Sequence, residues 1–182
     1  MLAATVRCAP KGRHIAYEPL PDLHPKLQRE FPDVAVRCAA LGVEPGRTSF
    51  VRVTEPLGYG GMRRQDYPTD FATETIDVAV QSIDASLPSD WVTTLIKVDV
   101  EGAERDVIAG GIETIRRFRP TVIFEFHKGS ARHYDSTPTD VHALLCGDAG
   151  LRIFDIDGGG PYTTQRLQET FDEGLMWNFV AH

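Results

Sequence analysis

The sequence is poor in the features that mark secreted, membrane and zinc-stapled proteins. Its three cysteines, Cys8, Cys38 and Cys146, are far apart and odd in number, and no CxxC pair occurs. This usage predicts neither a disulfide framework nor a zinc site, and it favours a reducing environment. No apolar run approaches the roughly 20 residues that span a bilayer, and the first residues do not resemble a secretion signal. We therefore expect a cytoplasmic protein with no membrane partner.

Positive charge is also in short supply. The 19 lysines and arginines stand against 26 aspartates and glutamates, so the formal net charge is −7. Nucleic-acid binding depends on basic side chains that neutralise phosphates, and we therefore expect no nucleic-acid partner. A composition of 42% hydrophobic and 25% charged residues is typical of one soluble globular domain. The sequence contains no internal repeat and no clear domain boundary.

Apolar runs of strand length alternate with segments of helical spacing, which is typical of an α/β layer fold. The segment PLGYGGMRRQDYP at 56–68 is rich in glycine and proline and predicts a loop, whose length fits a lid and a disordered loop equally well. The expected strands are 14–17, 34–41, 48–53, 75–83, 95–100, 121–126, 151–156 and 177–181. The expected helices are 21–31, 103–115 with an interruption at Gly110–Gly111, 137–145 with Thr137 as its cap, and 167–171.

Acidic groups and one histidine stand where three of the expected strands end. In an open parallel sheet, ligands gather at the carboxyl ends of the strands, because the loops diverge there and helix N-termini point toward them. Glu18 ends one expected strand, Asp99 and Glu101 end another, and Glu125 and His127 end a third. Strand alternation would place Asp99 and Glu101 on one face, and Glu125 and His127 on one face of the next strand. Such groups can take a proton, orient a hydroxyl or bind a divalent metal.

A structural interpretation competes with the functional one for these residues. Glu101 and Glu104 fall in the first turn of an expected helix, where the positive end of the helix dipole stabilises a carboxylate by about 0.3 to 1 kcal/mol. We favour this structural role for Glu104 and a functional role for Asp99, because Asp99 precedes the helix. For His127 the two interpretations stay open, since a lone histidine after a strand is often structural and only the neighbouring Glu125 argues for function.

The segment RIFDIDGGG at 152–160 offers a different chemistry. An apolar strand followed by Asp-x-Asp-Gly resembles the nucleophile loop of haloacid-dehalogenase-type phosphatases, in which the first aspartate attacks phosphorus. Only about twenty-five residues follow this loop, too few for the rest of such a site. We therefore predict that Asp155 and Asp157 are turn residues, with the glycines supplying positive φ angles, and rank a phosphatase low.

Five segments together carry a resemblance to a known family. They are IAYEPLPD at 15–22, AALG at 39–42, LIKVDVEGAERDVIAGG at 95–111, PTVIFEFH at 120–127 and the closing WNFVAH. In order and spacing they resemble the FkbM family of S-adenosylmethionine-dependent methyltransferases, and IKVDVEGAE is the most specific of them. The resemblance implies a Rossmann-like class I methyltransferase sheet, mainly parallel with an antiparallel last strand.

The resemblance also implies a cofactor site for S-adenosylmethionine. Glu18, followed by Pro19, resembles the acid that ends the second strand of such a sheet and binds the ribose hydroxyls. Its carboxylate can accept two hydroxyl hydrogen bonds at the sheet crevice, as in dinucleotide-binding folds. Ala40 and Leu41 resemble the segment near the adenine.

The implied reaction is methyl transfer to a hydroxyl oxygen of a small molecule, a natural product or a sugar. Asp99 would lie beside the methionine moiety and the acceptor, with Glu125 and His127 across the cleft. The protein's tasks in such a displacement are alignment, exclusion of water and help in removing the hydroxyl proton. His127 and Asp99 are both candidate bases, and the sequence does not choose between them. A metal-assisted variant also stays open, although the spacing of the carboxylates predicts no particular metal site.

One element of the family pattern has no counterpart in the sequence. Family members begin with a strand and a glycine-rich turn that cradles the methionine end of the cofactor, whereas MLAATVRCAPKG resembles the tail of the helix after that turn. The absent strand would be the central one, between those expected at 14–17 and 95–100. We expect 1–182 to be a single methyltransferase-like domain truncated at its N-terminus, or a degenerate relative that binds a glycan or partner without catalysis. Exposed strand edges would favour pairing between chains, so a homo-oligomer stays open.

Overall fold

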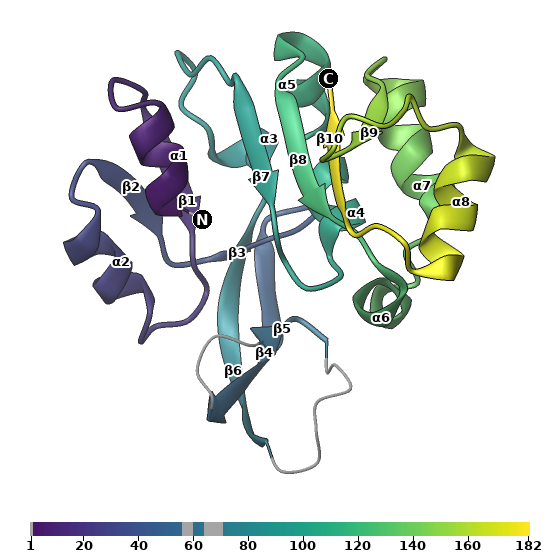
Figure 1. Cartoon of the computed structure of the whole chain (residues 1–182). Coiled ribbons are helices and arrows are strands. Elements are labelled where there is room, and N and C mark those ends of the chain that lie inside the picture. The colour runs from purple at the N-terminus through teal and green to yellow at the C-terminus, as the bar shows by residue number, and fades with distance from the viewer. Residues whose placement is uncertain (1, 56–59, 64–70) are drawn as a thin grey trace.

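The computed structural model describes residues 2–55, 60–63 and 71–182. Its central element is a four-stranded sheet in the order β7–β8–β10–β9 (Figure 1). Strands β7 and β8 are parallel, and β10 is antiparallel to both β8 and β9. The antiparallel last strand is therefore confirmed. The bounds are Leu95–Val98 for β7, Thr121–Glu125 for β8, Ile153–Asp155 for β9 and Asn178–Ala181 for β10.

Helices pack against this sheet and bury its apolar residues. Phe124 of β8 and Phe179 of β10 are fully buried, and their rings stack at a centroid distance of 5.6 Å. Phe126, just beyond β8, stacks on Phe171 at 4.9 Å. Each such side chain contributes about 1.5 to 3 kcal/mol through burial. The helices are α4 (Glu104–Ala109), α5 (Ile112–Phe118), α7 (Pro138–His142), which continues as a π-helical turn over Ala143–Asp148, and α8 (Thr164–Glu173).

Local chemistry sets two of the predicted helix boundaries. The Thr137 hydroxyl accepts the N–H of Asp140, and the Asp140 carboxylate accepts the N–H of Thr137, which is a capping box with a proline at the first helical position. Gly110 and Gly111 separate α4 from α5, which confirms the predicted interruption. A Cβ at Gly110 would come within 2.1 Å of the Gly42 carbonyl oxygen, so this close approach requires glycine.

A smaller sheet holds β1 (His14–Tyr17) parallel to β2 (Val34–Arg37). Helices α1 (Leu2–Cys8) and α2 (His24–Glu30) lie beside it, and neither contains a buried residue. Within the described part of the chain, β1 pairs only with β2 and β7 pairs only with β8. Each of these strands therefore has one unpaired edge.

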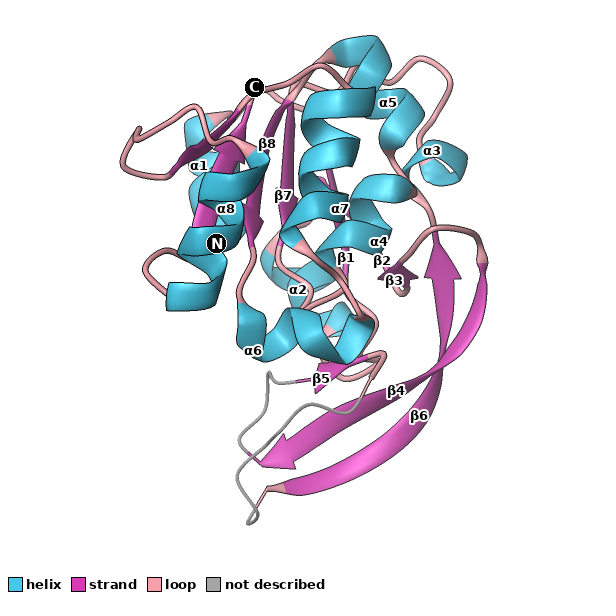
Figure 2. Cartoon of the chain, turned by 90° about the vertical axis from the view of Figure 1, so that its right-hand side faces the viewer, coloured by secondary structure: helices cyan, strands magenta, loops and turns pink. Residues whose placement is uncertain are grey.

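A long antiparallel hairpin of β4 (Gly46–Glu55) and β6 (Ala72–Gln81) extends away from the helices (Figure 2). It belongs to a third sheet in the order β3–β6–β4–β5, with β3 (Ala40–Leu41) and β5 (Gly60–Gly61). The expected strands 48–53 and 75–83 are confirmed in this hairpin, except that β6 ends at Gln81. Helix α3 (Ile83–Ser86) follows β6 and returns the chain to the central sheet.

Side chains connect the β1–β2 pair to the rest of the molecule. The Tyr17 hydroxyl lies 2.5 Å from Ser86 Oγ, and the Arg37 guanidinium donates to the Ser86 carbonyl oxygen. At the other end of β1, Arg13 forms an ion pair with Asp90 at 2.8 Å. These polar contacts add to the burial of Val34 and Val36 in β2, and no described strand joins the pair to the central sheet.

Two expectations need correction or fall outside the described residues. The expected strand 34–41 is broken at Cys38–Ala39: its first part pairs with β1, and its last two residues pair with β6 in another sheet. A continuous strand would have had to pair with β1 and with β6 in the same sheet, whereas these two strands belong to different sheets. In the expected loop, residues 60–61 form β5. Residues 56–59 and 64–68 lie outside the described residues, so the predicted lid is not tested.

Candidate active site

The carboxyl ends of β7 and β8 lie side by side, because the strands are parallel neighbours in register up to Val98 opposite Phe124. Asp99 follows β7 directly, with its side chain 44% exposed and its Oδ2 at 3.4 Å from Lys97 Nζ. Glu125 is the last residue of β8. The strand ends therefore bring Asp99 and Glu125 to the same edge of the sheet, as the sequence predicted.

His127 makes contacts on three sides at this edge. Its Nε2 lies 3.7 Å from Glu125 Oε1 and 3.3 Å from Ser130 Oγ, where Ser130 belongs to the short helix α6 (Lys128–Ala131). The imidazole ring stacks on the indole of Trp177 at a centroid distance of 4.8 Å. The Trp177 side chain remains half-exposed. A carboxylate, a hydroxyl and an aromatic ring thus fix the orientation of one imidazole.

Glu101 joins this cluster by a route that strand alternation does not predict. Strand β7 ends at Val98, so Asp99 and Glu101 do not share a strand face, and that expectation was wrong. Instead Glu101 adopts a left-handed backbone with φ 56°. Burial raises the pKa of the Glu101 carboxyl, and repulsion from Glu125 and Asp99 raises this pKa further. The tight turn, rather than the strand, brings a third carboxylate to the site.

Glu104 begins α4 as predicted, but it is not a surface charge. Glu104 is only 2% exposed to solvent. Its Oε1 accepts hydrogen bonds from the N–H groups of Val100 at 3.3 Å and Gly102 at 3.1 Å. Burial raises the pKa of Glu104 to about 7, although the hydrogen bonds from backbone N–H groups oppose the rise. The predicted helix-dipole role was therefore incomplete, because the preceding turn folds back over the carboxylate and buries it.

Gly102 presses this turn against the helical segment after β8. Its φ is +108°, and a Cβ there would lie 2.5 Å from the Ser130 carbonyl oxygen and 2.8 Å from the Tyr134 ring. Only glycine combines that backbone conformation with such a close approach. The Tyr134 hydroxyl in turn accepts the backbone N–H of Arg63, at 3.0 Å. The turn after β7 and the start of α6 are therefore one packed unit.

Glu18, the predicted ribose-binding acid, lies at the end of β1 and is half-buried. Its Oε1 accepts the N–H of Leu20 at 2.9 Å, and within the described residues its Oε2 accepts no hydrogen bond. Burial raises the pKa of Glu18, while the Leu20 N–H and the nearby His24 lower it. One carboxylate oxygen is thus fixed by the backbone, and the other has no hydrogen-bond donor among the described residues.

The remaining predicted cofactor residues lie near β1 and β3. Pro19 follows Glu18 and is half-buried, Ala40 is buried in β3, and Leu41 packs partly against the main core. Among the described residues, no hydrogen bond or ion pair links these four positions to Asp99, Glu125 or His127. The structure therefore gathers Asp99, which was predicted for both roles, with Glu125 and His127, and shows no direct polar contact among the described residues between this cluster and the other predicted cofactor residues.

Neither a metal-binding cluster nor a membrane-spanning helix occurs in the described ranges, which have gaps at 56–59 and 64–70. No cluster of three or more histidine, cysteine, aspartate or glutamate side chains has the geometry to hold a metal ion. No helix there is long and apolar enough to cross a bilayer.

Comparison with known proteins connects this geometry to a family. The model of the methyltransferase FkbM domain matches residues 1–150. The chain belongs to the FkbM methyltransferase family. The crystal structure of methyltransferase FkbM from Methylobacillus flagellatus KT resembles it in fold, with a TM-score of 0.59 and 16% sequence identity. The match covers 100% of this chain and 40% of that chain, and no curated protein matches.

The Asp-x-Asp-Gly segment at 155–158 forms a turn, as the sequence predicted. The buried Asp155 carboxylate accepts the N–H groups of Asp157 at 3.0 Å and Gly159 at 2.7 Å, and the hydroxyl of Tyr162 at 3.1 Å. Gly158 has φ 90° in the same turn. With three donors inside its own loop, the Asp155 carboxylate has a structural role.

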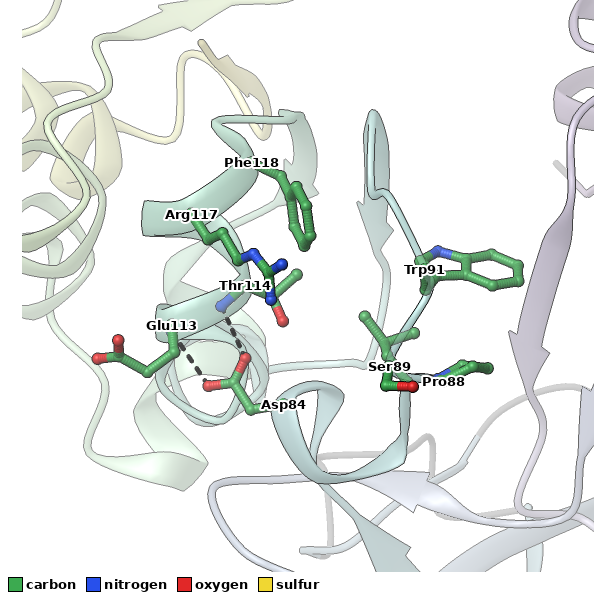
Figure 3. A pocket seen from close by; sticks show the side chains of 9 residues that line it. Asp84, Pro88, Ser89, Trp91, Glu113, Thr114, Arg117 and Phe118 are labelled. Carbon is green, nitrogen blue, oxygen red and sulfur yellow. Dashed lines mark hydrogen bonds between the residues drawn. The ribbon is translucent and has the colours of Figure 1, made fainter.

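A cavity of about 390 Å³ opens elsewhere, between α3, α5 and the segment 87–91 (Figure 3). On one side Asp84 accepts the N–H groups of Glu113 and Thr114 and so caps α5. Trp91 stands on the opposite side. None of the predicted site residues lines this cavity, so we place the chemistry at the strand ends, where the titratable groups gather.

Sequence reasoning missed two members of the candidate site and underrated a third. Ser130 stands three residues after His127, a spacing that brings side chains together in a helical turn, but the short α6 was not expected. Trp177 belongs to the closing motif, yet nothing in its neighbours indicated that it would contact His127. Glu101 precedes a glycine, and an acid followed by glycine is a turn signal that could have found its left-handed backbone.

Proposed function

We propose that this FkbM domain catalyses the S-adenosylmethionine-dependent methylation of a hydroxyl oxygen on a small molecule, a natural product or a sugar. The observation that supports this best is the cluster of Asp99, Glu101, Glu125 and His127 at the adjoining ends of two parallel strands. Groups that can accept a proton or orient a hydroxyl are what methyl transfer to oxygen requires of a protein. Membership of the family supports the methyl-transfer part of the proposal.

The residues near β1 fit the proposed cofactor. The free Oε2 of Glu18 would accept hydrogen bonds from ribose hydroxyls, and Leu41 together with Ala40 would contact the adenine. Asp99 would lie beside the methionine end. When bound, S-adenosylmethionine supplies a methyl group already activated by a sulfonium.

In the proposed mechanism, His127 is the base for the acceptor hydroxyl. The Glu125 carboxylate, 3.7 Å from Nε2, would stabilise the imidazolium that forms when the hydroxyl proton moves to the ring. Stacking on Trp177 and the contact with Ser130 restrain the imidazole ring. Because the ring is already oriented, little conformational entropy is lost when the acceptor binds and reacts. Asp99 is already paired with Lys97 and is better suited to orient the acceptor.

Methyl transfer tests the proposal directly. The protein would be incubated with S-adenosylmethionine carrying a radiolabelled methyl group and a panel of hydroxyl compounds, including sugars. We expect label in a hydroxyl acceptor, and a loss of about 100-fold or more in His127→Gln and Asp99→Asn. Asp157→Asn is the matched control, because it changes an exposed turn carboxylate outside the cluster. Equal rates in all four proteins would exclude the assigned roles.

A second candidate is a methyltransferase-like module that binds a glycan or partner without catalysis. The unpaired edges of β1 and β7 favour it, since no described strand joins the sheet next to Glu18 to the sheet of the catalytic cluster. A strand between these edges would pair with both and join the two sheets, and we propose that the domain is incomplete at this position. Titration calorimetry with S-adenosylmethionine separates the candidates. Binding that requires an N-terminally extended chain indicates an incomplete methyltransferase, whereas no binding in either form indicates the non-catalytic module.

A further inference from the structure

The buried carboxyl of Glu104 has no part in the proposed reaction, although it lies directly beneath the turn that carries Asp99 and Glu101. Its Oε1 accepts the N–H groups of Val100 and Gly102, and its Oε2 is buried without a hydrogen-bond partner in the described part of the chain. Burying a carboxylate costs free energy unless hydrogen bonds or an opposite charge compensate for the lost water. The question is what this carboxylate holds.

Two successive residues of the turn above Glu104 have a positive φ, which glycine adopts readily but glutamate does not. Glu101 has φ 56° and Gly102 has φ 108°, and for a residue with a side chain the left-handed conformation is intrinsically unfavourable. Such a conformation persists only where the surroundings determine it. The two N–H groups that point to Glu104 Oε1 lie on either side of Glu101, so one oxygen atom fixes both ends of the strained segment.

The same turn reaches the other strand end of the site. Gly102 lies against the Ser130 carbonyl, and the Ser130 hydroxyl lies 3.3 Å from His127 Nε2. A shift of the turn would therefore move Glu101 relative to Glu125 and also change the support of His127. Glu104 itself contacts backbone N–H groups of the turn. It can therefore influence the catalytic cluster only through the position of the turn.

We propose that Glu104 is a positioning residue, which fixes the turn after β7 so that Asp99 and Glu101 meet Glu125 and His127 in a reactive arrangement. This inference rests on the proposed methyltransferase function. It differs from a general stabilising role, because the predicted effect is confined to the turn and to the rate of methyl transfer.

The test compares Glu104→Ala and Glu104→Gln with Glu113→Ala as the matched control, since Glu113 is an exposed acid in the first turn of α5. Amide hydrogen exchange is measured at Val100, Gly102 and the core residue Phe124. We expect Glu104→Ala to speed exchange at Val100 and Gly102 at least about tenfold, with Phe124 unchanged. Glu104→Gln should restore protection, because its amide oxygen can accept the same two N–H groups. Glu113→Ala should change nothing.

Methyl transfer is measured on the same proteins. We expect Glu104→Ala to lower kcat at least about tenfold with little change in KM, and Glu104→Gln to recover most of the rate. Unchanged exchange at Gly102, or faster exchange at Phe124 to the same degree, would overturn the inference. If the alanine variant does not fold, Glu104→Asp replaces it, because a side chain shorter by one methylene cannot reach both N–H groups. An absence of methyl transfer in the unmodified protein would contradict the proposed function, while the exchange data would still decide whether Glu104 holds the turn.

Discussion

The central sheet and the β1–β2 pair differ in how they are held. The central sheet packs fully buried aromatic rings against four helices, with Phe124 and Phe179 in contact. Every residue of β1, from His14 to Tyr17, is only half-buried, and α1 and α2 bury no residue. The proposed catalytic cluster stands on the first region and Glu18 on the second. The proposed catalytic residues therefore lie next to a well-packed hydrophobic core. The proposed cofactor contact of Glu18 lies next to a strand whose residues are less completely buried.

Core truncation should give the largest contrast between the two regions. Phe124→Ala removes a fully buried ring and is expected to lower the free energy of unfolding by about 4 kcal/mol. Ile15→Ala in β1 removes a half-buried side chain and should lower it by about 1 kcal/mol. Urea denaturation of both variants measures the difference. Equal losses would mean that the two regions are equally packed.

Gly102→Ala tests the turn that links β7 to α6. The new Cβ would meet the Ser130 carbonyl oxygen in a backbone with φ +108°, so we expect a loss of about 3 kcal/mol in the free energy of unfolding. Gly147→Ala is the control, because nothing lies within 4 Å of a Cβ at that position. A Gly102→Ala protein as stable as the control would show that the turn is not pressed against α6.

The buried carboxyl of Glu104 should give the central region a pH-dependent stability of its own. Its pKa rises from 4.5 to about 7 on folding, so the folded state binds the proton more tightly than the unfolded state. The contribution to stability is therefore complete below about pH 4.5 and is lost as the pH rises through about 7, a fall of about 3 kcal/mol. In Glu104→Gln this component should be absent. Denaturant curves for both proteins between about pH 5 and 8 measure it, and parallel curves would contradict the assignment.

The smallest expected effect concerns the contacts between the two regions. Tyr17→Phe removes the hydroxyl that lies 2.5 Å from Ser86 Oγ, and should reduce the stability of the β1–β2 pair by about 1 kcal/mol. Amide exchange should accelerate in β1 and β2 and stay unchanged in β8. Acceleration in β8 as well would show that the two regions unfold as one unit.

Sequence reasoning succeeded where the signal is local. Apolar runs located the strands of the central sheet, Thr137 marked a helix start, and the acids after β7 and β8 were found because parallel strands end at one edge. It failed where pairing is distant in sequence. The break at Cys38–Ala39 arises because Ala40 pairs with Val80, which no local pattern reveals.

The candidate site shows the same division between local and distant causes. Asp99, Glu125 and His127 were identified from strand ends, but the contact of Trp177 with His127 joins segments fifty residues apart in sequence. The burial of Glu104 depends on a turn that folds back over its own helix, and only the left-handed backbone at Glu101 makes that possible. Side-chain environments set by such turns cannot be derived from residue types alone.

The most direct test of the methyltransferase assignment is the binding of S-adenosylmethionine, measured by titration calorimetry on the protein and on Glu18→Gln. Glutamine keeps the oxygen that accepts the Leu20 N–H, so only the proposed ligand contact changes. We predict one binding site whose affinity falls about tenfold or more in Glu18→Gln, since a hydrogen bond to a charged group is worth about 1.5 to 3 kcal/mol. Binding of equal strength in both proteins, or no binding even by an N-terminally extended chain, would contradict the account.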